Sequence, residues 1–378
     1  MGKIRLQGNG DGAMRILCLV TDAFGGHGGI SKFNRDLLEA LCTHDAVSEV
    51  VAIPRIMLNP PGALPAKLTY LTNGLDGKGK FFAQVLRTLM QGRRFDLLIC
   101  GHINLIPFSY LCRLFTRAPL ALIVHGIDAW QPTRRRLTNH LVGKIDALIS
   151  VSEFTRKRIQ GWASLEKARA FILPNCVDLS LFSPGPKNEN LLNRYGLNGK
   201  TVLMTLGRLD SRERAKGFDE TMEAMPKLVE RIPNLAYMIV GGGTDRNRLE
   251  EKAKSLNIKE RIVFTGLIPE EEKADHYRLA DAYVMPSMGE GFGIVLLEAM
   301  ACGIPTVASK MDGSREALRD GMLGILVDPL NPEEIIDGVL QALGSPRQIP
   351  KGLDYFSSAN FEVRVHDLLN TIRGAGTE

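Results

Sequence analysis

Two carboxylates stand close to several glycines in residues 287–303, SMGEGFGIVLLEAMACG. Glu290 lies within the glycine-rich part, and Glu298 follows inside an apolar run. An ionised carboxylate accepts hydrogen bonds from hydroxyl groups, and a glycine loop that opens a helix presents backbone N–H groups to an anion. The combination suits a ligand with hydroxyls next to phosphates. The alternative is a pair of solvated charges; against it, Glu298 stands between Leu297 and Ala299, and the loop holds more glycine than a turn requires.

The residues around the two carboxylates predict a strand, a loop and a helix. Residues 282–286 form a short apolar run that is typical of a buried strand. Residues 294–301 have the length and composition of a helix, which Gly303 and Pro305 would end. The positive end of this helix would therefore face an anion held by the loop.

The segment EGFGIVLLEAMACGIPTVAS resembles the donor-sugar motif of the retaining, GT-B-fold glycosyltransferases of family 4. The resemblance implies an α/β fold with two Rossmann-like domains, whose parallel sheets face a central cleft, and a C-terminal helix that crosses back to the first domain. It also implies retaining transfer of a hexose from a nucleotide-diphospho-sugar to an acceptor hydroxyl. It covers nearly the whole chain, because its motifs follow in order: Gly28-Gly29, His125-Gly126, Arg208 with Lys216, and Glu290 with Glu298.

The resemblance implies a role for each of these residues. Arg208 and Lys216 would stabilise the diphosphate, whose charge grows as the glycosidic bond breaks. Glu290 would hold hydroxyls of the donor sugar, Glu298 would hold those of the ribose, and His125 would touch the sugar and orient the attack. The expected catalytic set is His125, Arg208, Lys216 and Glu290. The expected donor-binding set is Gly28, Gly29, Gly207, Gly242, Leu267, Ile268, Gly291, Phe292, Gly293, Ile294 and Glu298.

Weaker signals mark an acceptor side. His102 and Asn104 follow a predicted strand at residues 95–100, and residues just past strand carboxyl ends line the ligand crevice of an open α/β sheet. For His102 a purely structural hydrogen bond is an equal alternative. Arg134 and Arg135 belong to a basic cluster, which is either a solvated face or a contact for lipid head groups or an acceptor phosphate.

One loop departs from the family pattern. Residues 210–215, DSRERA, are two residues longer than the usual loop between the arginine and the lysine. Arg212 or Arg214 could therefore share the phosphate-binding role with Lys216.

Charge is divided unevenly along the chain. Residues 1–185 hold 23 Lys+Arg and 13 Asp+Glu, whereas residues 186–378 hold 24 and 29. A basic first half indicates an anionic partner, and the sparse aromatic residues argue against nucleic acid. The expected partners are a nucleotide-sugar donor, a saccharide or polyprenyl-linked acceptor and an anionic membrane surface.

No cofactor is expected, because the nucleotide sugar is a co-substrate and the resemblance implies that the leaving phosphate accepts the acceptor's proton. The sequence contains no D-x-D motif, the pattern that would indicate a metal site. A UDP-sugar is placed before GDP-mannose as the donor, in bacterial-type polysaccharide or glycoconjugate synthesis.

The six cysteines lack metal-ligand spacing, and no apolar stretch reaches the ~20 residues of a membrane-spanning helix. These features predict a cytoplasmic protein with reduced cysteines. The basic first half adds, as a hypothesis, a peripheral location on the inner face of the membrane.

The domain boundaries follow from composition and motif order. Residues 1–13 are polar and glycine-rich and are expected to be a disordered leader, with Met14 as a candidate native start. The first domain would span 14–183, the second 184–355, and the closing helix 356–378 would pack on the first domain. A chain of 378 residues exceeds one ordinary core.

Two rival functions share the predicted fold. A nucleotide-sugar 2-epimerase would convert the donor without an acceptor, and a non-catalytic protein would bind the donor without turnover. A dehydrogenase is disfavoured, because the first glycine loop is not G-x-G-x-x-G and no acidic residue ends a second strand at the expected distance.

Overall fold

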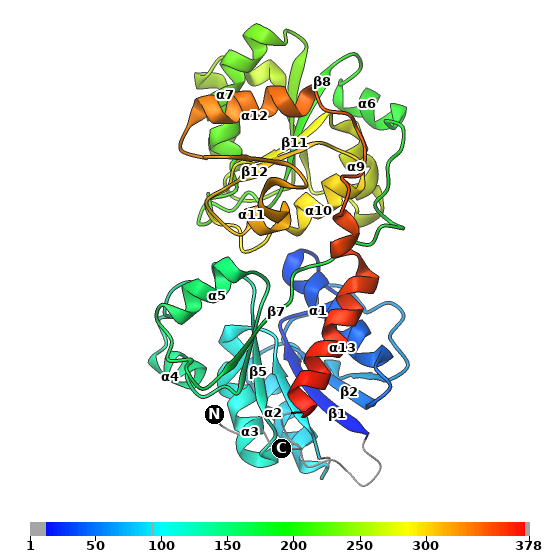
Figure 1. Cartoon of the computed structure of the whole chain (residues 1–378), viewed down its shortest axis with the longest axis vertical. Coiled ribbons are helices and arrows are strands. Elements are labelled where there is room, and N and C mark those ends of the chain that lie inside the picture. The colour runs from blue at the N-terminus through cyan, green and yellow to red at the C-terminus, as the bar shows by residue number, and fades with distance from the viewer. Residues whose placement is uncertain (1–12, 93, 375–378) are drawn as a thin grey trace. The chain divides into compact units, whose positions relative to one another are not determined.

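The computed structural model describes residues 13–92 and 94–374, so the predicted leader lies outside the described residues except for residue 13. The chain divides into two compact units (Figure 1). Unit 1 combines Met1–Cys176 with Ser358–Glu378, and unit 2 is Val177–Ser357. Residues 177–183, which the sequence analysis placed in the first domain, are counted with unit 2. Each unit is an α/β layer structure with a parallel sheet, which confirms the predicted fold class.

In the described part of unit 1, seven parallel strands form one sheet in the order β3-β2-β1-β4-β5-β6-β7. Ile16 of β1 pairs with Val50 of β2 and with Leu97 of β4. The central strands are apolar because a parallel sheet is covered on both faces. The short strand β3 has only three residues and lies in a stretch for which no strand was predicted. The strands are β1 Met14–Val20, β2 Val47–Pro54, β3 Leu68–Tyr70, β4 Leu97–Cys100, β5 Leu120–Val124, β6 Ala147–Ser150 and β7 Arg169–Ile172.

Helices cover the sheet of unit 1. Ser152 is the N-cap of α5, and its Oγ accepts a hydrogen bond from the backbone N of Thr155 at 3.0 Å. The C-terminal helix α13 packs on α1, with Phe361 edge-on to Phe33, so this helix joins unit 1 as predicted (Figure 1). The helices are α1 Gly29–Thr43, α2 Lys78–Met90, α3 Ile106–Thr116, α4 Arg136–Val142, α5 Glu153–Gln160 and α13 Ser358–Gly374.

Unit 2 repeats this architecture, with its described strands in the order β10-β9-β8-β11-β12-β13, all parallel. Met222 and Leu228 of α7 and Ile335 and Val339 of α12 pack in one apolar core with the strands. The strands are β8 Thr201–Leu206, β9 Leu235–Val240, β10 Ile262–Gly266, β11 Ala282–Met285, β12 Thr306–Ser309 and β13 Ile325–Val327. The helices are α6 Glu189–Tyr195, α7 Phe218–Arg231, α8 Arg246–Ser255, α9 Lys273–Leu279, α10 Ile294–Ala301, α11 Ser314–Ala317 and α12 Pro332–Leu343.

Each sheet has a point where the strand order reverses. This point lies between β1 and β4 in unit 1 and between β8 and β11 in unit 2. The loops that leave such neighbouring strands at their carboxyl ends form the crevice where open α/β sheets bind ligands. In unit 2 they are residues 207–217 and 286–293; in unit 1 they are residues 21–28 and the loop that starts at Gly101.

Candidate functional site

The two loops at the reversal point of unit 2 meet through Lys216 and Glu290. Nζ of Lys216 lies 2.5 Å from Oε2 of Glu290. The backbone supports this contact, because the N–H of Met288 donates to the carbonyl of Ala215 at 3.0 Å. Gly217 is required here: its φ is +81°, and a Cβ would lie 2.7 Å from the ring of Pro286. The close approach of the loops brings two of the predicted site residues together.

Asp312 fixes the glycine loop from the next strand. Its Oδ2 accepts hydrogen bonds from the backbone N of Glu290 at 2.8 Å and from Oγ of Ser287 at 2.7 Å. A Cβ on the neighbouring Gly313 would lie 2.1 Å from the carbonyl oxygen of Gly291, so only glycine fits there. Burial raises the pKa of Asp312 to about 6, although these hydrogen bonds act in the opposite direction. Asp312 is not among the site residues predicted from the sequence, although its place just after the short run 306–308 was an available signal.

The predicted phosphate-binding cations both follow β8. Burial acts to lower the pKa of Lys216, but the charge and hydrogen bond of Glu290 outweigh it, so the pKa is raised and the amine stays charged. The side chain of Arg208 is 74% exposed, and it pairs with Glu213 at 3.0 Å. An exposed ion pair of this kind contributes about 0–1 kcal/mol, so an incoming phosphate can replace Glu213 at small cost.

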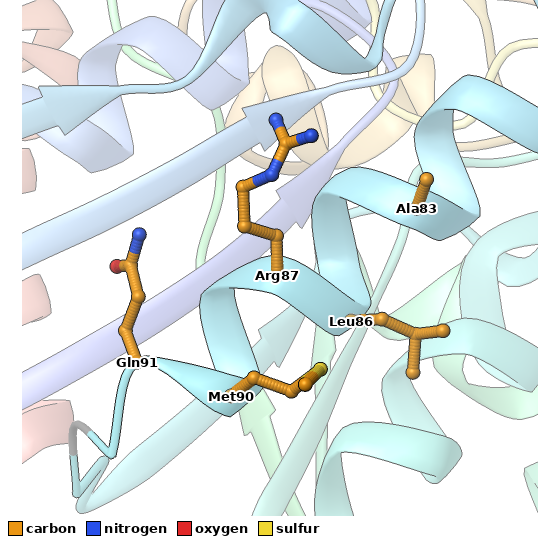
Figure 2. A pocket seen from close by; sticks show the side chains of 5 residues that line it. All are labelled: Ala83, Leu86, Arg87, Met90 and Gln91. Atoms are coloured by element: carbon orange, nitrogen blue, oxygen red, sulfur yellow. The ribbon is translucent and has the colours of Figure 1, made fainter.

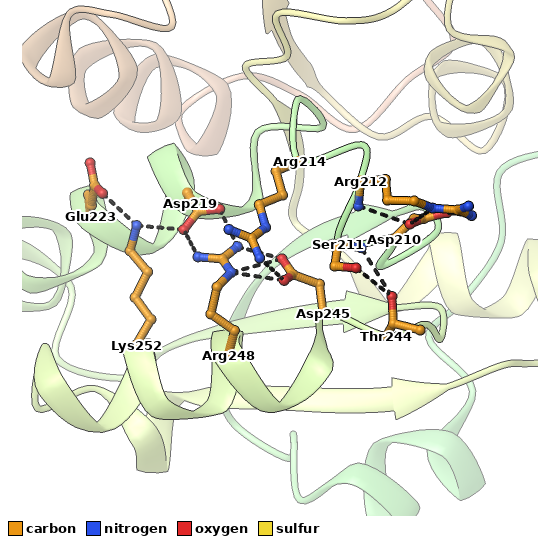
Figure 3. Close-up of polar contacts among 10 residues, drawn as sticks. All are labelled: Asp210, Ser211, Arg212, Arg214, Asp219, Glu223, Thr244, Asp245, Arg248 and Lys252. Atoms are coloured by element: carbon orange, nitrogen blue, oxygen red, sulfur yellow. Dashed lines mark hydrogen bonds and ion pairs between the residues drawn. The ribbon is translucent and has the colours of Figure 1, made fainter.

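The long loop at residues 210–215 is tied to the start of α8 (Figure 3). Arg214 pairs with Asp245 at 3.1 Å, and Asp245 is also held by Arg248. Arg212 turns back onto Asp210 at 3.0 Å. The described ion pairs of Arg212 and Arg214 are thus with Asp210 and Asp245, while Lys216 has the contact with Glu290.

Helix α10 begins directly after the glycine loop. Gly293 has a φ of +93° and precedes the first helical residue, Ile294, and the first turn holds no acidic side chain. An N-terminus of this kind favours an anion. The ring of Phe292 packs against Phe356 with centroids 5.4 Å apart and is buried, so Phe292 can offer a ligand only its backbone.

Glu298 lies in the second turn of α10, and its side chain is buried. It contacts Lys273 and Tyr277 of α9, neither of which the sequence analysis identified. The alternative of a solvated surface charge is therefore wrong for Glu298.

The predicted nucleotide-side residues gather where β8, β9 and β10 end. The backbone N of Gly207 donates to the carbonyl of Val240, and a Cβ on Gly242 would lie 3.2 Å from Leu267. Leu267 is exposed and Ile268 partly so. An exposed apolar side chain beside backbone groups suits a nucleobase, which has a flat face and hydrogen-bonding edges.

In unit 1, His125 stands at the end of β5. Its Nε2 lies 2.9 Å from the carbonyl oxygen of Gly101, and its ring is edge-on to Phe33. Because a carbonyl only accepts, we assign the proton to Nε2, which leaves Nδ1 as an acceptor. Burial lowers the pKa of His125 to about 4, so the ring is neutral at physiological pH.

His102 lies near a carboxylate that the sequence analysis did not consider. Its Nδ1 accepts the backbone N–H of Asn104 at 3.1 Å, and its Nε2 lies 3.8 Å from Oδ2 of Asp128. Burial raises the pKa of Asp128 to about 7. The described contact of Asn104 uses its backbone, which favours a structural role for this turn.

The remaining predicted residues of unit 1 are exposed. Gly28 has a φ of +95° and caps α1, and Gly29 is its first residue. Arg134 and Arg135 lie exposed in the loop before α4.

All six cysteines are buried and free of disulfides. Over the described ranges, no cluster of three or more His, Cys, Asp or Glu could hold a metal ion, and no helix is long and apolar enough to cross a membrane.

Comparison with known families matches both halves of the chain. The family described as "Glycosyl transferases group 1" matches residues 188–356, and "Glycosyltransferase Family 4" matches residues 27–181. A GDP-mannose-dependent alpha-(1-6)-phosphatidylinositol monomannoside mannosyltransferase of Mycolicibacterium smegmatis is 36% identical over 256 residues, 64% of this chain and 66% of that protein. A phosphatidyl-myo-inositol mannosyltransferase of Mycobacterium tuberculosis is 31% identical over 94% of this chain and 93% of its own length.

Solved structures show the same fold at lower identity. The sucrose-phosphate synthase of Thermosynechococcus elongatus superposes with a TM-score of 0.75 at 21% identity, covering 96% of this chain and 100% of its own. Anabaena HepE in complex with UDP-glucose gives 0.74 at 19% identity, covering 95% of this chain and 100% of its own. The two parallel-sheet units therefore have the GT-B fold.

Proposed function

The chain belongs to glycosyltransferase family 4, and from that premise we propose that it transfers a mannosyl group from GDP-mannose to a hydroxyl of a lipid-linked polyol or saccharide. The observation that carries this proposal is the contact of Lys216 with Glu290 at the reversal point of unit 2. A cation and a carboxylate side by side suit a sugar diphosphate, which offers phosphate oxygens next to hydroxyls.

Each residue has a task in this reaction. The bond from the sugar C1 to the diphosphate breaks, and Arg208 and Lys216 stabilise the negative charge that the leaving oxygen gains. Glu290 accepts hydrogen bonds from sugar hydroxyls, and the backbone at the start of α10 adds N–H donors. Neutral His125 orients the sugar through its acceptor nitrogen.

The choice of donor follows the relatives. The sequence alone placed a UDP-sugar first and GDP-mannose second. The first of the mannosyltransferases described above carries GDP-mannose in its name, at higher identity than the structures with UDP. We therefore take GDP-mannose as the donor, with the base contacted by the backbone around Gly242 and by Leu267.

The acceptor and the location are linked. The name of one relative contains phosphatidylinositol and that of the other phosphatidyl-myo-inositol, a lipid with a polyol head group. In unit 1, the exposed face of α2 carries Phe82 and Met90, the latter 83% exposed, and α2 contains Lys78, Lys80 and Arg87 without a carboxylate. Figure 2 shows Arg87 and Met90 beside a hollow on this helix. Such a face suits an anionic membrane surface.

A sedimentation assay tests the membrane location. Vesicles with and without anionic lipid are mixed with the protein at low and at high salt. We expect binding to anionic vesicles at low salt and release at high salt, because screening weakens charge attraction. Equal recovery in the supernatant in every condition would remove the membrane from the proposal.

The stereochemistry and the metal requirement form the finer part of the proposal. Retention follows if the acceptor hydroxyl attacks C1 on the face that the diphosphate leaves and gives its proton to a phosphate oxygen. No side-chain base and no metal is then needed. NMR of the product's anomeric proton, and assays with and without EDTA, test these two points separately.

Nucleotide binding gives a simple first test. A ligand that binds only the native state raises the melting temperature by mass action. We expect GDP and GDP-mannose to raise it and UDP and ADP to do so much less. A shift with UDP alone would replace the donor, whereas no shift with any nucleotide would contradict the proposed donor site.

A further inference from the structure

Glu298 is a buried carboxylate with both oxygens engaged. Its side chain is 1% exposed. Oε1 lies 2.8 Å from Nζ of Lys273, and Oε2 accepts a hydrogen bond from the hydroxyl of Tyr277 at 2.8 Å. Lys273 and Tyr277 are four residues apart on α9, so they share one face of that helix. The contacts fix the orientation of the carboxylate from two sides.

The side chain of Tyr277 is held in place by its packing. Its side chain is fully buried, and its ring lies against Phe182 and Tyr283. Its hydroxyl donates to Glu298, which leaves the second lone pair of Oε2 as an acceptor for a ligand. A hydroxyl held this firmly keeps the carboxylate in one rotamer.

Lys273 differs because it has some exposed surface. Its side chain is 15% exposed, and its Nζ lies against Oε1 of Glu298, so a ligand that bonds to Glu298 also comes close to Lys273. Its ammonium group has three N–H donors; one is directed to Glu298, and one to Glu270 at 3.4 Å. Burial acts to lower the pKa of Lys273, but the charges of Glu298 and Glu270 outweigh it and raise the pKa, so the amine stays protonated.

A hydroxyl both donates and accepts a hydrogen bond. The remaining lone pairs of Glu298 can accept from two neighbouring hydroxyls, and the third N–H of Lys273 can donate to an oxygen of the same diol. We propose that Lys273 binds the ribose diol of the donor nucleotide together with Glu298, and that Tyr277 is the positioning residue for that carboxylate. The inference rests on the proposed function, with Glu298 at the donor ribose as the family resemblance implies.

The test measures how much the protein prefers a ribose over a sugar without the diol. Calorimetry gives the affinity for GDP and for 2′,3′-dideoxy-GDP, and the ratio of the two reports the diol contacts alone. We expect a ratio of about tenfold or more in the wild type, because hydrogen bonds to charged groups are strong. In Lys273→Met and in Tyr277→Phe the ratio should fall below about threefold, through weaker binding of GDP.

Tyr283→Phe is the matched control, since it removes a hydroxyl from the same core without touching Glu298. Its hydroxyl bonds the backbone of Leu206, and we expect the ribose preference to stay at the wild-type value. A purely structural role of Lys273 and Tyr277 would lower the melting temperature but leave the ratio unchanged, which would overturn the inference.

The wild type separates this inference from the proposed function. Binding of GDP without preference over the dideoxy analogue would overturn the diol site and leave the donor site standing. Failure of the wild type to bind either nucleotide would contradict the proposed function, and the inference with it. If Lys273→Met does not fold, the ratio of GDP to dideoxy-GDP affinity in Tyr277→Phe still tests whether Tyr277 positions Glu298. The same ratio in Lys273→Gln then tests whether Lys273 contacts the diol.

Discussion

Nζ of Lys216 lies 2.5 Å from Oε2 of Glu290, although 74 positions separate them in the chain. The contact joins the loop after β8 to the loop after β11, the two strands at which the order of the sheet reverses. An open α/β sheet concentrates its ligand contacts at this point.

The two residues should act as one unit. Lys216→Met and Glu290→Ala should each lower turnover by about 10²-fold or more, as the loss of a transition-state contact does. The double variant should lose little more than either single variant, because residues that act together are not additive. Steady-state kinetics of the three variants measures this; independent, multiplying losses would mean that the contact has no common role.

Two arginines near β8 provide a matched comparison. Arg208→Ala should lower turnover by about two orders of magnitude through the lost stabilisation of the diphosphate. Arg212 is 86% exposed and pairs only with its neighbour Asp210 among the described ion pairs, so Arg212→Ala should stay within about twofold of the wild type. Turnover at saturating donor is measured for both variants. Equal losses would show that Arg208 does not stabilise the diphosphate in particular.

Gly313 should tolerate no side chain. A Cβ would lie 2.1 Å from the carbonyl oxygen of Gly291, so Gly313→Ala must push the glycine loop away and should destabilise unit 2 by about 2 kcal/mol. Gly62→Ala is the control, because nothing lies within 4 Å of its Cβ position, and it should change stability by less than about 0.5 kcal/mol. Denaturant titration compares them; an unaffected Gly313→Ala protein would mean that the loop is not held where the structure places it.

Asp312 should leave a pH signature on stability. Burial raises its pKa to about 6, from an unfolded value near 3.8. The folded state therefore binds a proton that the unfolded state lacks between about pH 4 and 6, and this contribution to stability is lost as the pH rises through 6. The melting temperature of the wild type relative to Asp312→Asn should thus be higher at pH 5 than at pH 7. A difference in melting temperature between the two proteins that stays constant from pH 5 to pH 7 would mean that Asp312 does not titrate in this range.

The fold and the backbone of the site could be predicted because their signals are local. Apolar runs of strand length, glycine loops and helix ends follow each other in the chain, and the order of motifs places Lys216 and Glu290 on loops. The direction in which a side chain points could not be predicted in the same way. Phe292 stands in a glycine-rich loop but turns its ring into the core against Phe356, and no local pattern indicates this.

The residues that support the site were missed for the same reason. Tyr277 and Lys273 contact Glu298 from another helix, and Asp312 reaches the N–H of Glu290 from the loop after a different strand. Such contacts depend on how helices pack on the sheet and not on a spacing in the sequence. The short strand β3 escaped prediction because a run of three residues has no readable period.

Sugar transfer itself is the most direct test of the proposed function. The purified protein is incubated with GDP-mannose that carries radiolabel in the sugar and with vesicles that contain phosphatidylinositol or its monomannoside, and the organic phase is counted. We expect label in the lipid with the wild type and a roughly hundredfold lower rate with Glu290→Ala. Label that stays with the nucleotide in the presence of both lipids would contradict the proposed donor and acceptor, and conversion of the donor to an epimer without any lipid product would assign the chain to a different reaction.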